Sequence, residues 1–279
     1  MSLVAVKATE AGYSRPKPFL KWAGGKTQLL PEILARFPTR FGRYFEPFVG
    51  GGAVFFALGP RRAVLTDINE NLINTYKMIR DDLDGVIAAL DKHRATEEHF
   101  YRVRAQNPAA LSPLQAAART IYLNRTCFNG LYRVNAKGQF NVPYGRYERP
   151  NICNVANLQA VCLALRGVDL RVSDVVKATT GAKRGDLIYF DPPYDPVSPT
   201  ASFTSYTAGR FGREDQARLA RRFGELAAKG VHVVLSNADT PLICDLYKDF
   251  RIERVRARRA INSRADRRGP VSEVIITAP

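Results

Sequence analysis

The 279-residue sequence has few cysteines and no long hydrophobic run. No apolar stretch suits a signal peptide, because Lys7, Glu10, Arg15 and Lys17 interrupt the N-terminal region, and no later segment approaches the length of a membrane span. A cytoplasmic protein is expected. The cysteines form no Cys-x-x-Cys pair, so we interpret them as reduced thiols and expect neither a disulfide framework nor a metal site: Cys127, Cys153, Cys162 and Cys244.

Acidic residues are also scarce. The chain has 42 Lys and Arg against 26 Asp and Glu, which gives a formal net charge of +16. This excess is unusual for an enzyme of small neutral metabolites and indicates a polyanionic partner such as nucleic acid, with an anionic membrane as the weaker alternative. Arginine supplies 31 of the 42 basic residues. A GC-rich genome would explain that ratio but not the sign of the charge.

Short hydrophobic runs alternate with helical patterns at both ends of the chain. Two strand-turn-helix units in succession, with strands at 44–45 and 63–66, indicate a parallel, doubly wound α/β sheet. An amphipathic helix ending at Pro38 precedes them. Further strands are expected at 170–173, 187–190, 231–237, 251–257 and 271–277.

The strand-helix alternation lapses between residues 76 and 165. Helical patterns at 82–93 and 113–124 are followed by a loop at 124–147 that mixes aromatic, polar and basic residues around an expected turn at 135–138. We interpret this stretch as an inserted subdomain.

A glycine turn at 50–52 follows the first strand, and Asp67 ends the second. Glycines let a ligand approach the backbone, and a carboxylate after the second strand can accept hydrogen bonds from ribose hydroxyls, so the pattern suits an adenosine-containing cofactor. Phe55 stands where a dinucleotide fingerprint needs a third glycine, which disfavours NAD. In the alternative, structural interpretation, the glycines only make a tight turn and Asp67 caps the following helix.

The stretch Ala-Gly-Gly-Lys-Thr at 23–27 is reminiscent of a phosphate-binding loop. Such a loop requires glycine at position 20, where Leu20 stands, so an ATPase is disfavoured. Trp22 and Lys26 can instead contact a ligand, because an indole face holds a cation and a lysine bonds a carboxylate. A core tryptophan and a solvated lysine are the alternative.

The stretch "DLIYFDPPYDP" at 186–196 ends a buried strand in an acid, two prolines and a tyrosine. An aromatic amine is a poor nucleophile because its lone pair is delocalised. Asp191 and the carbonyl oxygen of Pro192 are rigid acceptors that can bond both amino hydrogens and localise that pair. Tyr194 can stack on a base rotated out of its duplex. A strand terminator with a helix cap is the alternative.

Five motifs in order resemble the DNA adenine methylase (Dam-type) family of adenine-N6 DNA methyltransferases: "PFLKWAGGK", "FEPFVGGGAVFF", "TDINENLINTY", "NRTCFNGLYRVN…GQFNVPYGR" and "DPPY". The resemblance covers nearly the whole chain, from Pro18 to Thr277. It implies S-adenosylmethionine as methyl donor, adenine in duplex DNA as target, and Asp191, Pro192 and Tyr194 as catalytic residues. The donor-binding positions that it implies are Trp22, Lys26, Gly50, Gly52, Asp67 and Asp191.

The resemblance also implies a Rossmann-like, mostly parallel seven-stranded sheet with an antiparallel last strand and an inserted, mainly helical target-recognition domain. Residues 1–75 and 166–279 would form the catalytic domain and residues 76–165 the insertion, with a DNA-contacting hairpin at about 124–147. The family usually has an aromatic residue after the acid that follows the third strand, to pack on the donor adenine. Here that pair is Asp174 and Val175, so the adenine pocket is expected to be either looser or filled by Phe48 or another side chain.

The resemblance maps DNA recognition onto Lys21, Phe128, Asn129, Leu131 and Arg133. An aromatic such as Phe128 can wedge into the base stack, and Arg133 has the fork geometry for guanine O6 and N7. A solvated hairpin is the alternative. Because enzymes with this hairpin commonly read GATC, the resemblance favours GATC or a related GAT-containing site.

An arginine-rich segment between Arg251 and Arg268 is expected to contact phosphates, with a solvated loop as the alternative. We therefore expect an orphan or restriction-linked adenine-N6 DNA methyltransferase that flips its target base and forms no covalent intermediate. No obligate protein partner or membrane is implied. The alternatives are the same chemistry on RNA or single-stranded DNA, and an inactive DNA-binding protein that keeps the fold.

Overall fold

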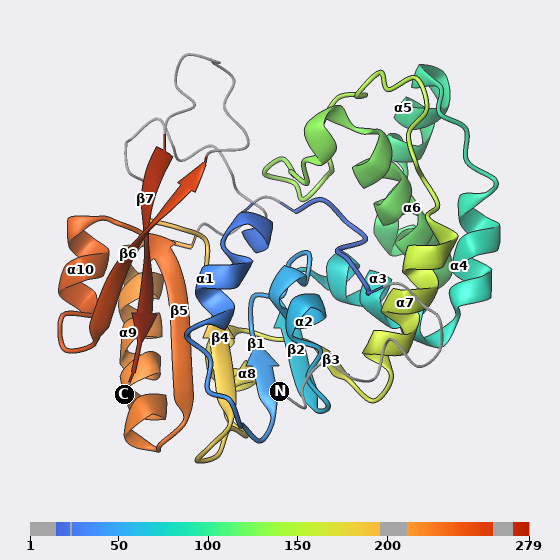
Figure 1. The fold of residues 1–279 in the computed structure, drawn as a ribbon. Coiled ribbons are helices and arrows are strands. Elements are labelled where there is room, and N and C mark those ends of the chain that lie inside the picture. Colours follow the sequence, from blue (N-terminus) through green and yellow to red (C-terminus); the bar gives the residue numbers. More distant parts are fainter. Residues whose placement is uncertain (1–14, 23, 196–210, 259–269, 279) are drawn as a thin grey trace.

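The computed structural model describes residues 15–22, 24–195, 211–258 and 270–278 (Figure 1). Its centre is a seven-stranded sheet in the order β3-β2-β1-β4-β5-β7-β6. The strands are β1 (Tyr44–Glu46), β2 (Ala63–Asp67), β3 (Asp169–Val172), β4 (Leu187–Phe190), β5 (His232–Ala238), β6 (Arg251–Arg258) and β7 (Pro270–Thr277).

The five strands from β3 to β5 in this order run parallel, and β7 is antiparallel to both β5 and β6. The predicted mostly parallel sheet with an antiparallel last strand is confirmed. All four residues of β4 are buried, as expected for a central strand covered on both faces. Phe190 of β4 lies beside Leu235 of β5, so the residues that follow them, Asp191 and Ser236, are neighbours at the carboxyl edge of the sheet.

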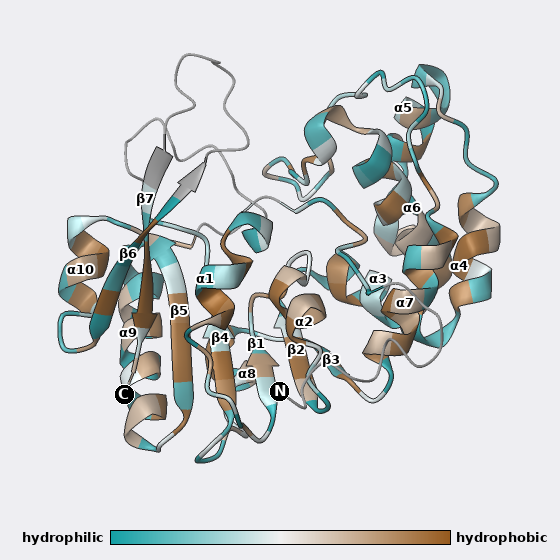
Figure 2. Ribbon diagram, in the orientation of Figure 1, coloured by the Kyte–Doolittle hydropathy of each residue, from teal (hydrophilic) through white to brown (hydrophobic). Residues whose placement is uncertain are grey.

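Alternating side chains of the strands pack into two cores, one on each face of the sheet. Leu187 and Tyr189 face a core that includes residues of α1 (Leu30–Leu34), α2 (Ala53–Leu58) and α3 (Glu70–Asp81). Ile188 and Phe190 face a core with α8 (Val175–Ala178), α9 (Arg213–Ala228) and α10 (Pro241–Leu246). Figure 2 shows the hydrophobic residues concentrated along β4 and β5 between these layers.

The inserted helices lie to one side of the sheet (Figure 1). They are α4 (Leu83–Leu90), α5 (Glu97–Ala105), α6 (Pro113–Thr126) and α7 (Val155–Leu165), and both α6 and α7 pack against α3. The helices predicted at 82–93 and 113–124 are confirmed as α4 and α6. The predicted domain boundary at residue 76 falls inside α3, and the division into domains stays a prediction. None of the described helices is long and apolar enough to cross a membrane.

Two local expectations differ from the structure. The amphipathic helix expected to end at Pro38 is shorter, with a 3-10 turn, η1 (Lys26–Gln28), before α1, which ends at Leu34. Residues 124–147 form the expected turn, where Gly138 N donates to Asn135 O at 2.9 Å, but their pairing is limited to isolated bridges rather than regular strands. The arginine-rich loop at 259–269, with Arg267 and Arg268, lies outside the described residues.

Candidate active site

The glycine turn after β1 requires residues without a side chain. Gly50 and Gly52 have φ values of 47° and 70°, in the left-handed region that favours glycine. A Cβ on Gly50 would lie 2.8 Å from Trp22 Cδ1, and one on Gly52 would lie 2.6 Å from the Tyr76 hydroxyl oxygen. The turn is therefore closed around Trp22 on one side and Tyr76 on the other, and Tyr76 also donates to Gly50 O at 3.0 Å.

Asp67 ties the end of β2 to this turn. Its Oδ2 accepts from Gly50 N at 3.2 Å and its Oδ1 from Asn69 N at 2.9 Å. Burial, the largest effect, raises the pKa of Asp67 to about 6 although these backbone hydrogen bonds lower it. The alternative in which Asp67 caps the next helix is wrong, because Asn69 is the N-cap of α3 and accepts from Leu72 N.

Asp191 begins the loop after β4 and is held through one oxygen. Its Oδ1 lies 2.8 Å from Lys26 Nζ and accepts from Ser236 Oγ at 3.0 Å, and Ser236 Oγ is 2.8 Å from the Tyr189 hydroxyl. Burial raises the pKa of Asp191, against the effect of Lys26 and Ser236. Within the described part of the chain no group donates to Asp191 Oδ2 or to the Pro192 carbonyl oxygen.

The rest of the loop is fixed by side chains from other elements. Gln216 of α9 donates to Pro193 O at 2.9 Å, and Asn237 of β5 accepts from Asp195 N at 3.2 Å while donating to Gln216 at 3.1 Å. These hydrogen bonds tie residues 193–195 to α9 and β5.

Tyr194 points its hydroxyl toward β7. It donates to Glu273 Oε2 at 2.7 Å, and Lys26 Nζ lies 4.6 Å from the centre of its ring. Lys26 thus contacts both Asp191 and Tyr194, two of the three residues predicted to be catalytic.

A further carboxyl group lies beneath the site. Glu46 at the end of β1 is 2% exposed and accepts from the Tyr44 hydroxyl at 2.8 Å. Burial raises the pKa of Glu46 to about 8; the bond from Tyr44 opposes this rise, and the nearby charge of Asp191 adds to it. At neutral pH this side chain is therefore mainly a neutral acid.

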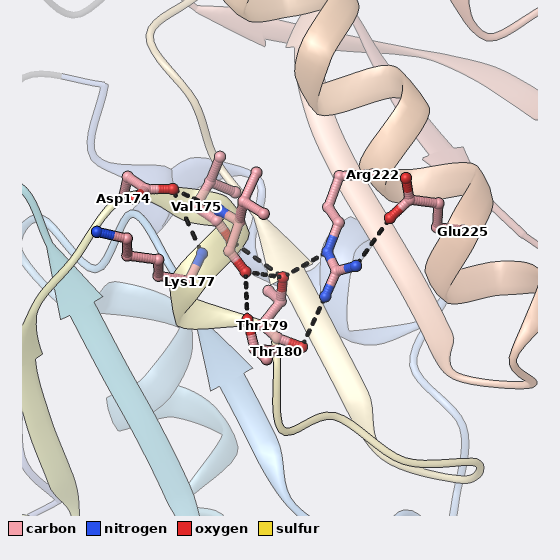
Figure 3. Close-up of polar contacts among 8 residues, drawn as sticks. Asp174, Val175, Lys177, Thr179, Thr180, Arg222 and Glu225 are labelled. Atoms are coloured by element: carbon pink, nitrogen blue, oxygen red, sulfur yellow. Dashed lines mark hydrogen bonds and ion pairs between the residues drawn. The ribbon is translucent and has the colours of Figure 1, made fainter.

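The predicted donor positions at the third strand have structural roles (Figure 3). Asp174 is the N-cap of α8 and accepts from Val176 N at 2.9 Å and Lys177 N at 3.3 Å. Val175 is 4% exposed and belongs to the core between the sheet and α9, so its side chain is unavailable to a ligand. Arg222 of α9 holds this turn by donating to the Thr179 hydroxyl and carbonyl oxygens at 2.9 and 3.0 Å.

Two other apolar side chains lie near the edge of the sheet. Phe48 is half-buried in the turn after β1 and packs edge-to-face on Phe211, with ring centres 5.7 Å apart. Ile68, which directly follows Asp67, is 61% exposed and was not identified from the sequence. Nothing in the sequence indicated this, because a hydrophobic residue type does not tell whether its side chain is exposed.

The hairpin residues predicted to read DNA lie at the surface or bond within the hairpin. Phe128 is 51% exposed, and Leu131 is half-buried. Asn129, at φ 56°, donates its backbone N–H to the Tyr147 hydroxyl at 3.0 Å. Arg133 Nε donates to Asn141 Oδ1 at 2.8 Å.

Lys21, Trp22 and Lys26 connect this hairpin to the strand ends. Lys21 exchanges two 2.8 Å hydrogen bonds between its backbone and the Asn124 side chain. Trp22 touches the Gly50 turn and stacks on Tyr132 of the hairpin, with ring centres 4.9 Å apart. Since Lys26 bonds Asp191, one short segment contacts the hairpin, the glycine turn and the loop after β4.

A cavity of about 960 Å³ opens beside the hairpin, between the N-terminal end of α3, α5 and the turn at 135–138. Arg104, Arg119 and Lys137 line it, with Glu70 as its acidic residue. Arg119 donates to two backbone carbonyls, of Val103 and Arg104, so its position is fixed.

Comparisons with known proteins cover almost the whole chain. A family model described as D12 class N6 adenine-specific DNA methyltransferase matches residues 22–261. A type II methyltransferase of Lactococcus lactis subsp. cremoris is 43% identical over 269 residues, which cover 94% of this chain and 95% of the relative. DNA adenine methylases of Haemophilus influenzae and Escherichia coli are 34% and 35% identical, with 93% of this chain and 92% and 94% of the relatives covered.

Proposed function

This chain belongs to the D12 class of N6 adenine-specific DNA methyltransferases, and we propose that it uses S-adenosylmethionine, flips the target adenine out of duplex DNA and acts within GATC or a related GAT-containing site. The observation that carries the proposal is Asp191, which is anchored through one oxygen and offers the other at the end of a buried strand. A cytoplasmic location, and the absence of an obligate protein partner, stay predictions.

The residues at the strand ends fit a methyl donor that carries an adenosine and an amino acid. Gly50 has no room for a side chain beside Trp22, so the turn presents backbone there, and Asp67 offers a carboxylate at the next strand end. Trp22 and Lys26 complete this half of the site. When bound, S-adenosylmethionine supplies an electrophilic methyl group on a sulfonium centre.

The adenine ring of the donor needs an apolar cover, and Val175 is too deeply buried to provide it. We assign this role to Ile68, which is exposed next to Asp67, with Phe48 as the side chain on the opposite turn. Asp174 then contributes by shaping the α8 turn.

Asp191 and Pro192 activate the substrate amine. Asp191 Oδ2 and the Pro192 carbonyl oxygen accept the two amino hydrogens, which localises the lone pair on N6 and directs it at the methyl group. Lys26 and Ser236 hold Asp191 through Oδ1 during this step, so the acceptor does not need to move. Tyr194 stacks on the flipped base. Transfer would be direct: the bond from N6 to the methyl carbon forms as the bond from the sulfonium sulfur breaks, S-adenosylhomocysteine leaves, and the surplus amino proton passes to solvent, with no covalent intermediate on the protein.

The hairpin and Lys21 read the DNA. Arg133 exchanges its bond to Asn141 for guanine O6 and N7, Phe128 enters the stack that the adenine leaves, and Asn129 and Leu131 line the same turn. Lys21 reads the first base pair of the site. The basic cavity lined by Arg104, Arg119 and Lys137 supports a duplex path along this face, because cations position phosphates without reading sequence.

The test is to express the protein in cells without adenine methylation and to sequence their DNA with modified-base detection. Methyladenine in GATC, or in one recurrent GAT-containing site, is expected. Purified protein should also transfer labelled methyl groups to a duplex carrying that site faster than to the single strand or to RNA. Methylcytosine, a site without GAT, or a preference for RNA would each contradict part of the proposal.

A further inference from the structure

Glu273 is the one carboxylate of β7 among the described residues, and it reaches the loop after β4 across the sheet edge. β7 runs antiparallel to β5, and Glu273 pairs with Ala238, the last residue of β5. This register carries the Glu273 carboxylate to the Tyr194 hydroxyl, which donates to Oε2 at 2.7 Å. The contact joins residues that are 79 positions apart in the chain.

A carboxylate in this position is costly for the fold. Burial raises the pKa of Glu273, and the nearby Asp191 adds to the rise, while Tyr194 and Lys26 lower it. A neutral residue would avoid both the desolvation of a charge and the repulsion from Asp191. The neighbouring strand gives a contrast, because Glu253 of β6 pairs with Arg36 at 3.1 Å, an ordinary ion pair away from the loop.

The hydroxyl bond fixes the direction in which the Tyr194 side chain points. The hydroxyl oxygen lies on the axis of the broad χ2 torsion, so this bond sets the place of the far end of the ring, and packing on a ring face sets the ring plane. Lys26 lies over one face of the Tyr194 ring, and Glu273 holds its far end. An ionised carboxylate only accepts hydrogen bonds, which makes the Tyr194 hydroxyl the donor in this pair.

We infer that Glu273 is a positioning residue for methyl transfer: through its hydrogen bond to the Tyr194 hydroxyl, it holds the far end of the aromatic ring at the place where the target base stacks beside Asp191. The inference rests on the proposed function, because it takes Tyr194 as the residue that stacks on the base. Glu273 itself does not touch the substrate. It acts in the bound complex, after DNA and donor have been recognised elsewhere.

The experiment is a double-mutant cycle of Glu273→Leu and Tyr194→Phe, measured by steady-state methylation of a duplex carrying the site found for the wild type. Each single variant should lower kcat about 10-fold and leave KM for DNA within about 3-fold, because the base is misaligned only after binding. The kcat of the double variant should be no lower than that of the less active single variant, since both changes remove the same hydrogen bond. Losses that multiply to about 100-fold would overturn the inference.

Two further variants keep the result interpretable. Glu273→Gln retains an oxygen acceptor and should restore kcat to within about 3-fold of the wild type, whereas a loss as large as that of Tyr194→Phe would contradict a role through this hydrogen bond. If Glu273→Leu does not fold, this comparison of Glu273→Gln with Tyr194→Phe decides. Glu253→Gln is the matched control on β6 and should leave kcat unchanged. Failure of the proposed function would appear differently, as a wild type that methylates no adenine.

Discussion

The proposed catalytic edge of the sheet and the proposed recognition hairpin differ in how their candidate residues are held. At the catalytic edge, side chains from β4, β5, β7 and α9 bond to one another across the sheet, and Ser236, Lys26 and Glu273 hold partners that come from distant parts of the chain. In the hairpin, Arg133 and Asn129 bond to residues of the hairpin itself.

This difference follows from what each region has to do. In the function that we propose, the catalytic edge presents fixed acceptors to a reacting amine, and preorganised groups avoid reorganisation during the reaction. The hairpin would exchange its internal bonds for bonds to DNA, and the partners in those bonds, Asn141 and Tyr147, are half-buried. Perturbing the first region should therefore change rates and stability, and perturbing the second should change discrimination and affinity.

The sharpest test of the comparison is Asp191→Asn. Replacing the carboxylate by an amide removes the negative charge that draws on the amine, so kcat should fall about 10³-fold while duplex binding stays within about 2-fold. Single-turnover methyl transfer and a DNA-binding titration measure the two effects. Asp186→Asn, at the other end of the same strand, removes the ion pair with Arg43 and is the control, with lower stability and unchanged kcat expected. Equal rate losses in both variants would show that Asp191 acts only on the fold.

Glu46→Gln tests how much folding stability the wild type loses by burying this carboxyl group near Asp191. The folded-state pKa of about 8 lies above the ordinary value of 4.5, so the folded protein keeps a proton that the unfolded chain has released. Wild-type stability is therefore lost as the pH rises from about 5 through 8, and Glu46→Gln should lose less over that window. At pH 9 the free energy of unfolding of Glu46→Gln should exceed that of the wild type by about a few kcal/mol at most, which is the most that the pKa shift of Glu46 permits.

Urea unfolding of wild type and Glu46→Gln at pH 5 and pH 9 measures this difference. Glu214→Gln, at an exposed position in α9, is the control and should leave the pH dependence unchanged. A parallel pH dependence in wild type and Glu46→Gln would mean that Glu46 is already ionised in the folded protein at neutral pH.

The sequence predicted the catalytic edge in outline because each of its main features is local. Short runs of adjacent residues mark three features: the strand ending at Asp191, the glycine turn at 50–52 and the second strand ending at Asp67. All three lie, as expected, at carboxyl ends of parallel strands. The roles assigned to these residues come from the family resemblance and stay predictions.

Partners across the sheet could not be predicted. Ser236, Asn237 and Glu273 sit in hydrophobic strand segments, and their contacts with the loop after β4 depend on the order of β4, β5 and β7 and on their register. The buried acid Glu46 gave no signal either, because its partner Tyr44 lies two residues away on the same face of the strand, a spacing common to all strands.

Arg133→Ala probes the exchangeable side of the comparison. Loss of a bidentate guanine contact costs about 1–3 kcal/mol of discrimination, so the ratio of kcat/KM for the true site over a site with that guanine replaced should fall about 10- to 100-fold. Methylation of the two duplexes in competition gives the ratio directly. Arg61→Ala, at an exposed position in the turn before β2, is the control. A uniform loss on both duplexes would indicate that Arg133 contacts phosphate rather than a base.

Lys137→Ala should have the smallest effect, because it removes one exposed charge from the hairpin turn, and the Lys137 side chain makes no hydrogen bond to the residues that the structure describes. A lysine that neutralises one phosphate contributes about one unit to the slope of log affinity against log salt, and this variant should reduce the slope by about that amount without changing site preference. DNA-binding titrations across a salt series measure it. Lys229→Ala removes an equally exposed lysine at the end of α9, next to the amino end of β5 and away from the catalytic edge (Figure 1), and should leave the slope unaltered. If both variants change the slope equally, the positive charge of the whole chain attracts DNA without a local site. The hairpin would then contribute no more to DNA affinity than other basic surface does, which would contradict its proposed role.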